Sequence, residues 1–226
     1  MPNRGKLKSV MKGNHMSEIH RISSGNVNCY IISNGERAIL VDAGTTRHKE
    51  KILSQCKLFN IQLIVLTHGH LDHCQNAAFL SEALQVPVAI SKEDMNLIPD
   101  NMKQPLLAKT FWGKIIRRFS ITSFKHDTLP LFKPDVFLAE GDDLTSYGIT
   151  ARVIALPGHT EGSIGLDVDG DKLIVGDSLM NMFYPTVSML YGNREQMLES
   201  ARKISEIGKR KIYFGHGSSR ENRIWV

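Results

Sequence analysis

Four side chains that bind metal ions well lie within six consecutive positions of the chain: His68, His70, Asp72 and His73. Imidazole nitrogens and carboxylate oxygens bind zinc at about 2.0–2.2 Å. His68 and His70 alternate along an extended turn and point to one side of it. Asp72 and His73 begin the next predicted helix and can point to a second position nearby. One loop can therefore supply two adjacent metal ions with two ligands each.

Three further candidate ligands stand directly after predicted strands, each beside a glycine: His159, Asp177 and His216. Loops at the ends of strands are where a rigid sheet presents functional side chains. Each of the three, taken alone, could equally be a structural residue, but together they complete two coordination spheres. The other histidines are interpreted as ordinary core or surface residues: His15, His20, His48 and His126.

The elements that must position these loops fall into two halves of similar order. The first half is predicted to have strands over 19–22, 27–32, 37–41, 61–66 and 86–90, with helices over 46–59 and 72–84. The second half is predicted to have strands over 136–138, 149–155, 163–168, 172–175 and 211–214, with a helix over 194–207. Asn34-Gly35 and Asp169-Gly170 are typical of hairpin turns. Two half-sheets, each with its own helices, predict an α/β (α+β) fold, a four-layer αββα sandwich.

The order of these motifs resembles the metallo-β-lactamase superfamily. The matching segments are His68-x-His70-x-Asp72-His73, Pro157-Gly158-His159-Thr160, Gly176-Asp177 and Gly215-His216. The resemblance covers 27–217 and implies one metal ion held by His68, His70 and His159, a second held by Asp72, His73 and His216, and Asp177 bridging the two. It also implies that Asp42 supports the ligands, although Asp42 could equally be a turn residue.

The resemblance implies a metal-dependent hydrolase with two zinc ions per chain. Iron or manganese is possible, because histidine and aspartate suit all three metals. Two such ions can lower the pKa of a shared water and polarise a substrate carbonyl. Asp72 is the expected catalytic residue, orienting the nucleophile and carrying a proton to the leaving group. Cys74 is a possible nucleophile, but a buried helix cysteine is the preferred interpretation.

The expected substrate is a small ester, thioester or lactone. The alternatives are a mononuclear iron dioxygenase of the persulfide type, a phosphodiesterase or nuclease, and a non-catalytic binding protein. A bridging Asp177 argues against the true β-lactamases. The chain is expected to lack the C-terminal domain that binds glutathione in glyoxalase II, which places glutathione thioesters in doubt. It is also too short for the large inserted domain of the nucleic-acid-processing members, and it shows no inserted arm like that of transfer-RNA-trimming nucleases.

A basic, amphipathic segment over 99–133 separates the two halves, where the superfamily places a cap over the metals. It carries an apolar stripe that includes Trp112, with Arg117 and Arg118 beside it. One hypothesis is an apolar pocket with a basic rim, suited to an anionic acyl compound; the other is an ordinary helix with a solvated basic face. Phe183 and Tyr184 are predicted to line the pocket from the other side.

The net charge of +5 comes from two segments rather than from the whole chain. Residues 1–17 and residues 99–133 carry the excess of basic residues, so the charge does not indicate a nucleic-acid partner. Residues 1–16 are predicted to be a leader or disordered tail, and 17–226 one domain. No apolar run is long enough to span a membrane. Three cysteines without paired spacing and no secretory signal favour a cytoplasmic protein that acts on a small molecule.

Overall fold

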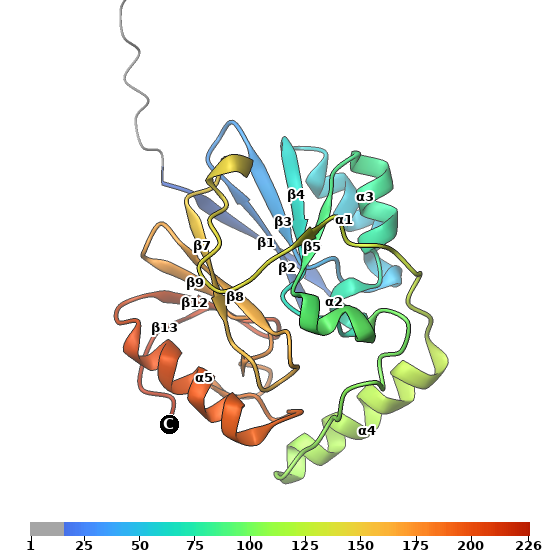
Figure 1. Ribbon diagram of the computed structural model, residues 1–226, viewed down its shortest axis with the longest axis vertical. Coiled ribbons are helices and arrows are strands. Elements are labelled where there is room, and N and C mark those ends of the chain that lie inside the picture. The colour runs from blue at the N-terminus through green and yellow to red at the C-terminus, as the bar shows by residue number, and fades with distance from the viewer. Residues whose placement is uncertain (1–15) are drawn as a thin grey trace, which may run out of the picture.

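Two β-sheets lie face to face in the computed structural model, which describes residues 16–226 (Figure 1). The first sheet has six strands in the order β1-β2-β3-β4-β5-β6, and the second has five in the order β13-β12-β9-β8-β7. The strands of the first sheet are β1 (Glu18–Ser24), β2 (Val27–Ser33), β3 (Ala38–Val41), β4 (Ile61–Val65), β5 (Val88–Ile90) and β6 (Val136–Phe137). The strands of the second sheet are β7 (Ala151–Ala155), β8 (Ile164–Val168), β9 (Lys172–Ile174), β12 (Lys211–Tyr213) and β13 (Arg220–Glu221).

Strand direction changes within each sheet. Strands β1, β2 and β3 pair antiparallel, whereas β3 to β6 pair parallel to one another. In the second sheet β7, β8 and β9 pair antiparallel, and β12 lies parallel to β9. The parallel strands require crossovers, which the helices supply.

The central strands of the first sheet are buried on both faces, and alternate residues serve different layers. In β2, Tyr30 and Ile32 pack between the two sheets, whereas Cys29 and Ile31 pack toward the helices. This is the two-residue period of a strand. A strand buried on both faces needs apolar residues in succession, as the sequence from Val27 to Ser33 provides for most of its length.

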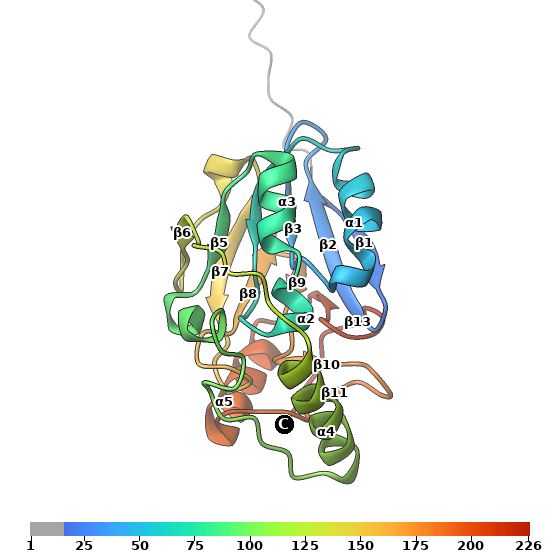
Figure 2. The ribbon, with the colours of Figure 1, turned by 90° about the vertical axis from the view of Figure 1, so that its right-hand side faces the viewer.

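Helices cover the outer face of each sheet. The helices and helical turns are η1 (Thr46–His48), α1 (Lys49–Cys56), α2 (Leu71–Cys74), α3 (Ala77–Leu84), η2 (Lys92–Leu97), α4 (Phe111–His126), η3 (Thr145–Tyr147) and α5 (Arg194–Glu206). Helices α1 and α3 lie on the first sheet, and α5 lies on the second (Figures 1 and 2). The four-layer αββα sandwich predicted from the sequence is confirmed.

The long helix predicted over 72–84 is wrong in one respect: it is two helices. The first helix, α2, is a single turn. Asn76 interrupts the helix before α3 begins. The Asn76 amide donates to the carbonyl oxygens of Ala43 and Thr45, both at 2.8 Å. These bonds take the side chain out of the helical pattern and hold α2 against the end of β3. The helix predicted over 46–59 likewise begins as the 3-10 turn η1.

Several short elements were not predicted, namely η2, η3, β13 and two strands that pair with each other. Strands β10 (Leu179–Met180) and β11 (Thr186–Val187) form a separate hairpin just past Asp177. The connecting arm between them carries Phe183 and Tyr184, which are 55% and 49% exposed. In Figure 2 this arm and α4 lie at the same end of the sandwich.

The segment predicted as a cap contains α4. Thr110 caps the N-terminus of this helix, and its side chain accepts a hydrogen bond from the Gly113 backbone N–H at 3.1 Å. A threonine in this position satisfies a free donor of the first helical turn. Helix α4 runs to His126, beyond the stripe expected from the sequence. Across residues 16–226, no helix is both long enough and apolar enough to cross a membrane. The tail predicted at 1–16 lies, but for Met16, outside the described residues.

Candidate metal centre

The loop after β4 carries four of the predicted ligands and is held by Asp42, at the end of β3. Asp42 Oδ1 accepts hydrogen bonds from Thr67 N at 2.8 Å and Thr67 Oγ1 at 3.0 Å. Its Oδ2 lies 2.8 Å from His73 Nδ1. Asp42 is 1% exposed and has a φ of 62°, a conformation that non-glycine residues rarely adopt. Strain of this kind is typical of functional sites, and the contacts give Asp42 the supporting role that the resemblance implied.

The short helix α2 gives the side chains of Asp72 and His73 different directions. The backbone N–H groups of His73 and Cys74 both donate to the carbonyl oxygen of His70, at 3.0 and 3.1 Å. This turn places His73 in the interior while Asp72 stays 32% exposed by side chain. Two directions from one loop are thus produced by one helical turn.

The structure brings all seven predicted ligands together. Their donor atoms lie within 4.8 Å of one another in three overlapping groups. These groups are His68, His70 and His159; His68, His73 and Asp177; and Asp72, His73 and His216. The first and third groups are the two metal sets that the resemblance implied.

Asp177 lies between those two sets. Its Oδ2 is 3.1 Å from His216 Nε2 and 3.8 Å from His159 Nε2, and its Oδ1 is 3.5 Å from His73 Nε2. One carboxylate therefore faces ligands of both sets. Gly215 makes this placement possible, because a Cβ there would overlap Asp177 Oδ1.

Unpaired polar atoms support a metal site. Among the described residues, three buried side-chain nitrogen or oxygen atoms have no hydrogen-bond partner: His68 Nε2, His73 Nε2 and Asp177 Oδ1. Burying such atoms without a partner is costly. All three lie in this cluster, and all three can coordinate a metal ion. The donor set therefore fits the two ions implied by the family pattern.

Hydrogen bonds at Nδ1 orient three of the imidazole rings so that Nε2 points toward the centre of the cluster. His73 Nδ1 faces Asp42, His159 Nδ1 faces the Leu190 carbonyl at 2.9 Å, and His216 Nδ1 faces the Asn26 carbonyl at 2.8 Å. A carbonyl or carboxylate accepts, so each Nδ1 carries a proton and each Nε2 is the nitrogen that faces the centre. Such partners fix the tautomer of a metal-binding histidine.

Burial and charge set the protonation of the cluster. Burial lowers the pKa of His68 and of His70 well below 6.5, so both rings are neutral near pH 7. Burial also lowers the pKa of His73, but the carboxylates of Asp42, Asp177 and Asp72 outweigh it and raise that pKa to about 10. For Asp177, burial raises the pKa, but His216 and His73 outweigh it and hold it well below 3.8.

Asp94 is a supporting residue that sequence reasoning missed. It is fully buried and accepts hydrogen bonds from the N–H groups of Gly69 and Gly162 and from Thr160 Oγ1, each at 2.8 Å. The Gln104 amide donates to it at 3.0 Å. Asp94 therefore ties the loop of His68 and His70 to the loop of His159. Asp94 stands beside Glu93 in a short polar run that starts at Lys92, and this pattern gives no sequence signal for its role.

Cys74 is not placed as a nucleophile. Its side chain is buried, and its Sγ donates to the His68 carbonyl oxygen at 3.0 Å. Burial raises the pKa of this thiol well above its ordinary value, and a protonated thiol is a poor nucleophile. The structure thus favours the interpretation of Cys74 as a buried helix cysteine.

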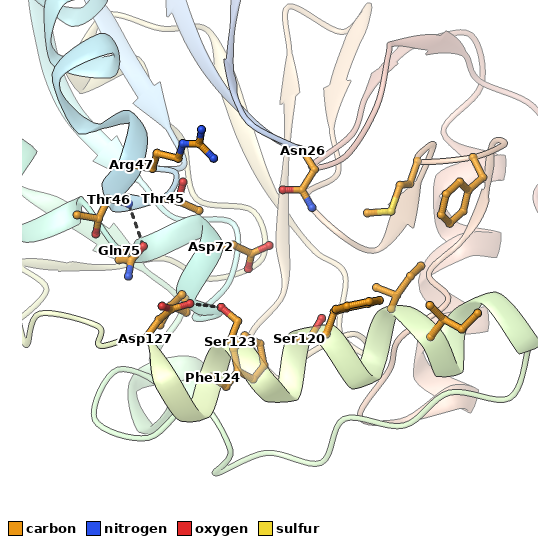
Figure 3. Close-up of a pocket in the computed structure, with 16 residues that line it drawn as sticks. Asn26, Thr45, Thr46, Arg47, Asp72, Gln75, Ser120, Ser123, Phe124 and Asp127 are labelled. Carbon is orange, nitrogen blue, oxygen red and sulfur yellow. Dashed lines mark hydrogen bonds between the residues drawn. The ribbon is translucent and has the colours of Figure 1, made fainter.

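A cavity of about 570 Å³ opens beside the centre, between α2, η1, α4 and the β10–β11 arm (Figure 3). Asp72 lines it and so connects it to the metal ligands. The lining residues are Asn26, Thr45, Thr46, Arg47, Leu71, Asp72, Gln75, Ile115, Ile116, Phe119, Ser120, Ser123, Phe124, Asp127, Met182 and Phe183.

The predicted substrate residues are placed differently from one another. Phe183 lines the cavity, and Trp112 packs on it with ring centroids 5.2 Å apart. Tyr184 is on the same arm but is not among the lining residues. Arg117 and Arg118 do not line the cavity either, so the structure does not show the basic rim expected from them. Arg117 Nε instead donates to the Leu106 carbonyl oxygen.

The reason for this difference is helical periodicity. The lining positions of α4 recur every three or four residues and define one face, from Ile115 to Phe124. Positions 117 and 118 fall between them, on other faces of the helix. The one basic side chain among the described lining residues is Arg47, which comes from η1.

The family model described as metallo-beta-lactamase superfamily matches residues 23–216. The hydroxyacylglutathione hydrolase GloC of Haemophilus influenzae is 27% identical over 209 residues, which cover 89% of this chain and 90% of that protein. Among solved structures, the BLEG-1 B3 metallo-beta-lactamase superposes with a TM-score of 0.71 at 21% identity, covering 90% of this chain and 94% of that one. A di-iron-bound form of TTHA1623 superposes with a TM-score of 0.68 at 22% identity, covering 92% of this chain and 100% of that one. At these identities the structural likeness shows the fold alone.

Proposed function

The chain belongs to the metallo-β-lactamase superfamily, and on this premise we propose that it is a dinuclear metallohydrolase that cleaves a small thioester or a related ester or lactone. One observation carries the proposal. Asp177 faces ligands of both metal sets, with distances of 3.1 Å to His216 and 3.8 Å to His159. A mononuclear iron dioxygenase would need only part of this donor set, so the geometry favours two ions.

The seven ligands would hold the two ions as described above: His68, His70 and His159 for one, Asp72, His73 and His216 for the other, and Asp177 shared. When bound, such ions supply Lewis-acid polarisation of a carbonyl and activation of water near neutral pH. Zinc is our first expectation. Iron is the main alternative, because the ligand types suit both metals and TTHA1623 has been solved in a di-iron form.

Asp72 is the residue of this chain placed to handle a proton. Its carboxylate lines the cavity, and Oδ2 lies 3.7 Å from His216 Nε2. With its side chain 32% exposed, Asp72 lines the large cavity, whereas Asp177 lines only the smaller recess beside it. A carboxylate between ligands and substrate can orient a water molecule and pass its proton to the leaving group.

The thioester is preferred within the substrate class because of one relative. GloC, named a hydroxyacylglutathione hydrolase, is matched over 90% of its length. A thioester, including one of glutathione, is therefore compatible with the region that the two chains share. The partner we propose is a small molecule, and three buried free cysteines are compatible with a reducing, cytoplasmic location.

The test is hydrolysis of acyl thioesters by protein reconstituted with zinc, with the metal content measured on the same samples. Asp177→Asn should lose both turnover and bound metal, whereas Asp72→Asn should lose turnover and keep the ion held by the three-histidine set. Asp143→Asn makes the same chemical change at an exposed carboxylate that accepts from Thr145 N, and it should behave as wild type. A fully metal-loaded protein that hydrolyses no thioester, ester or lactone would contradict the proposal.

A further inference from the structure

Helix α4 has an apolar face that the protein core does not cover. Within α4, all of whose residues are described, Gly113 alone is buried. Phe119 is 71% exposed, and Ile115 and Ile116 are partly exposed. A surface helix usually packs its apolar face on the core. Here that face lines the cavity beside the metal ligands instead.

The cavity has two ends of different chemistry. Since a helix rises about 1.5 Å per residue, Ile115 and Phe124 lie about 13 Å apart along α4, and Asp127 follows directly after the helix. At the first end Ile115, Ile116 and Phe119 face the cavity, and the stacking of Trp112 on Phe183 holds the β10–β11 arm near the start of the helix. Apart from Ser120, the described side chains that line that end are apolar.

The other end is polar. Figure 3 shows Thr45, Thr46, Arg47 and Gln75 opposite Ser123 and Asp127, with Asp72 and Asn26 facing the interior between them and the apolar end. Gln75 accepts from Thr46 N at 2.9 Å, which fixes η1 against α2. One cation and one carboxylate line this end, Arg47 and Asp127. Their charges offset each other, so this end suits a hydrogen-bonding group better than a strongly anionic one.

The metal ligands lie beside the middle of this cavity. A smaller recess, bounded by His70, His159, Asp177 and His216, shares Ile116, Ser120, Phe124 and Met182 with the large cavity. The ring of Phe124 lies 5.2 Å from that of His70. A substrate whose scissile bond lies at the metal centre would therefore place one part in the apolar end of the cavity and the other part in the polar end.

We propose that the apolar end, formed by Ile115, Ile116, Phe119, Met182 and Phe183, binds the apolar acyl chain of the substrate, while the polar end binds the leaving group. The substrate class is then a thioester or ester of a medium-length, uncharged acyl group, not of a short or anionic one. This inference rests on the proposed hydrolysis and specifies which molecule undergoes it.

The test is a chain-length series of thioesters that share one thiol, N-acetylcysteamine, with acetyl, butanoyl, hexanoyl and octanoyl groups. Zinc-loaded protein should show kcat/KM that rises with chain length, by at most about fourfold per buried methylene. Phe119→Ser should lower the octanoyl value about tenfold relative to the acetyl value, because it removes apolar surface from the cavity. Phe111→Ser is the matched control: Phe111 is also 71% exposed and in α4, but it does not line the cavity.

A flat series in the wild type, or equal effects of the two phenylalanine variants, would overturn the inference and leave the proposed hydrolysis standing. Binding of 1-octanol, measured by calorimetry, gives a readout without turnover. Octanol that binds in a Phe119-dependent way, with no thioester hydrolysed, would support the apolar site and contradict the reaction. Octanol that binds both variants as it binds the wild type would overturn the site itself.

Discussion

Replacing Asp42 by asparagine should weaken metal binding without disturbing the backbone. Asparagine tolerates the left-handed conformation that Asp42 adopts at φ 62°. Both carboxylate oxygens of Asp42 accept hydrogen bonds, from Thr67 N and Oγ1 and from His73 Nδ1. An amide must place its NH2 group against one of these donors, so Asp42→Asn loses at least one bond and the negative charge.

The magnitude follows from the bond to His73, which is 2.8 Å long and charge-assisted. A hydrogen bond to a charged group contributes about 1.5–3 kcal/mol. Loss of the partner that orients a ligating histidine usually lowers metal affinity about 10- to 100-fold, which is about 1.4–2.8 kcal/mol. The two ranges agree. The loss should fall mainly on the set of Asp72, His73 and His216, because Asp42 reaches His68 only through Thr67.

The assay is a zinc titration against a chromophoric chelator at fixed pH, with the folded fraction followed by circular dichroism. Wild type should bind two ions, and Asp42→Asn should show one site weakened 10- to 100-fold. Asp143→Asn again serves as the exposed control. Asp42→Asn protein that binds both ions as tightly as wild type would refute the claim that Asp42 orients His73 for coordination.

Three other predictions concern the same centre. Gly215→Ala should lower the metal-to-protein ratio below two, because the new Cβ would displace the Asp177 carboxylate; an unchanged ratio by elemental analysis would show that the carboxylate is dispensable. Zinc binding at pH 7 should release the proton that the metal-free protein holds on His73, whose pKa is raised to about 10, so apparent affinity should rise between pH 7 and 10 and the calorimetric enthalpy should depend on the buffer. An enthalpy independent of buffer would contradict this protonation state. Cys74→Ala should keep turnover within about twofold and cost about 1–2 kcal/mol of stability in denaturant unfolding, whereas loss of turnover in folded protein would mark the thiol as catalytic.

The ligands could be located from the sequence because each depends on local features. A predicted strand followed by a glycine and a histidine or aspartate places that side chain at a sheet edge, and several such edges converge in a face-to-face sandwich. His159, Asp177 and His216 reach the site by this route, and the other four ligands come from the single loop and helical turn after β4. The apolar alternation of strands such as β2 likewise made the two-sheet core predictable.

The residues that line the cavity could not be predicted from local sequence features. The apolar stripe of α4 is compatible with a face packed on the core or with a face lining a cavity, because hydrophobic periodicity is the same in both cases. The sequence suggested Arg117 and Arg118 as its basic residues, yet the cation that lines it is Arg47, far away in the chain. Asp94 was missed for a related reason. Its four hydrogen bonds come from three different segments, so only the folded chain shows them.

The origin of the ligands on both halves of the chain has a consequence for folding. His68 and His216 are about 150 residues apart, and the metal sets draw on both sheets. Each ion would thus act as a cross-link that closes long loops, and free energy of metal binding to such sites is also free energy of folding. Hydrogen bonds already join the halves, since Tyr30 in β2 donates to the carbonyl oxygen of Phe214 at 2.6 Å and His216 faces Asn26. The melting temperature should therefore depend on the free metal concentration. A chelator should first weaken the contacts between the two sheets, such as that of Tyr30 with Phe214.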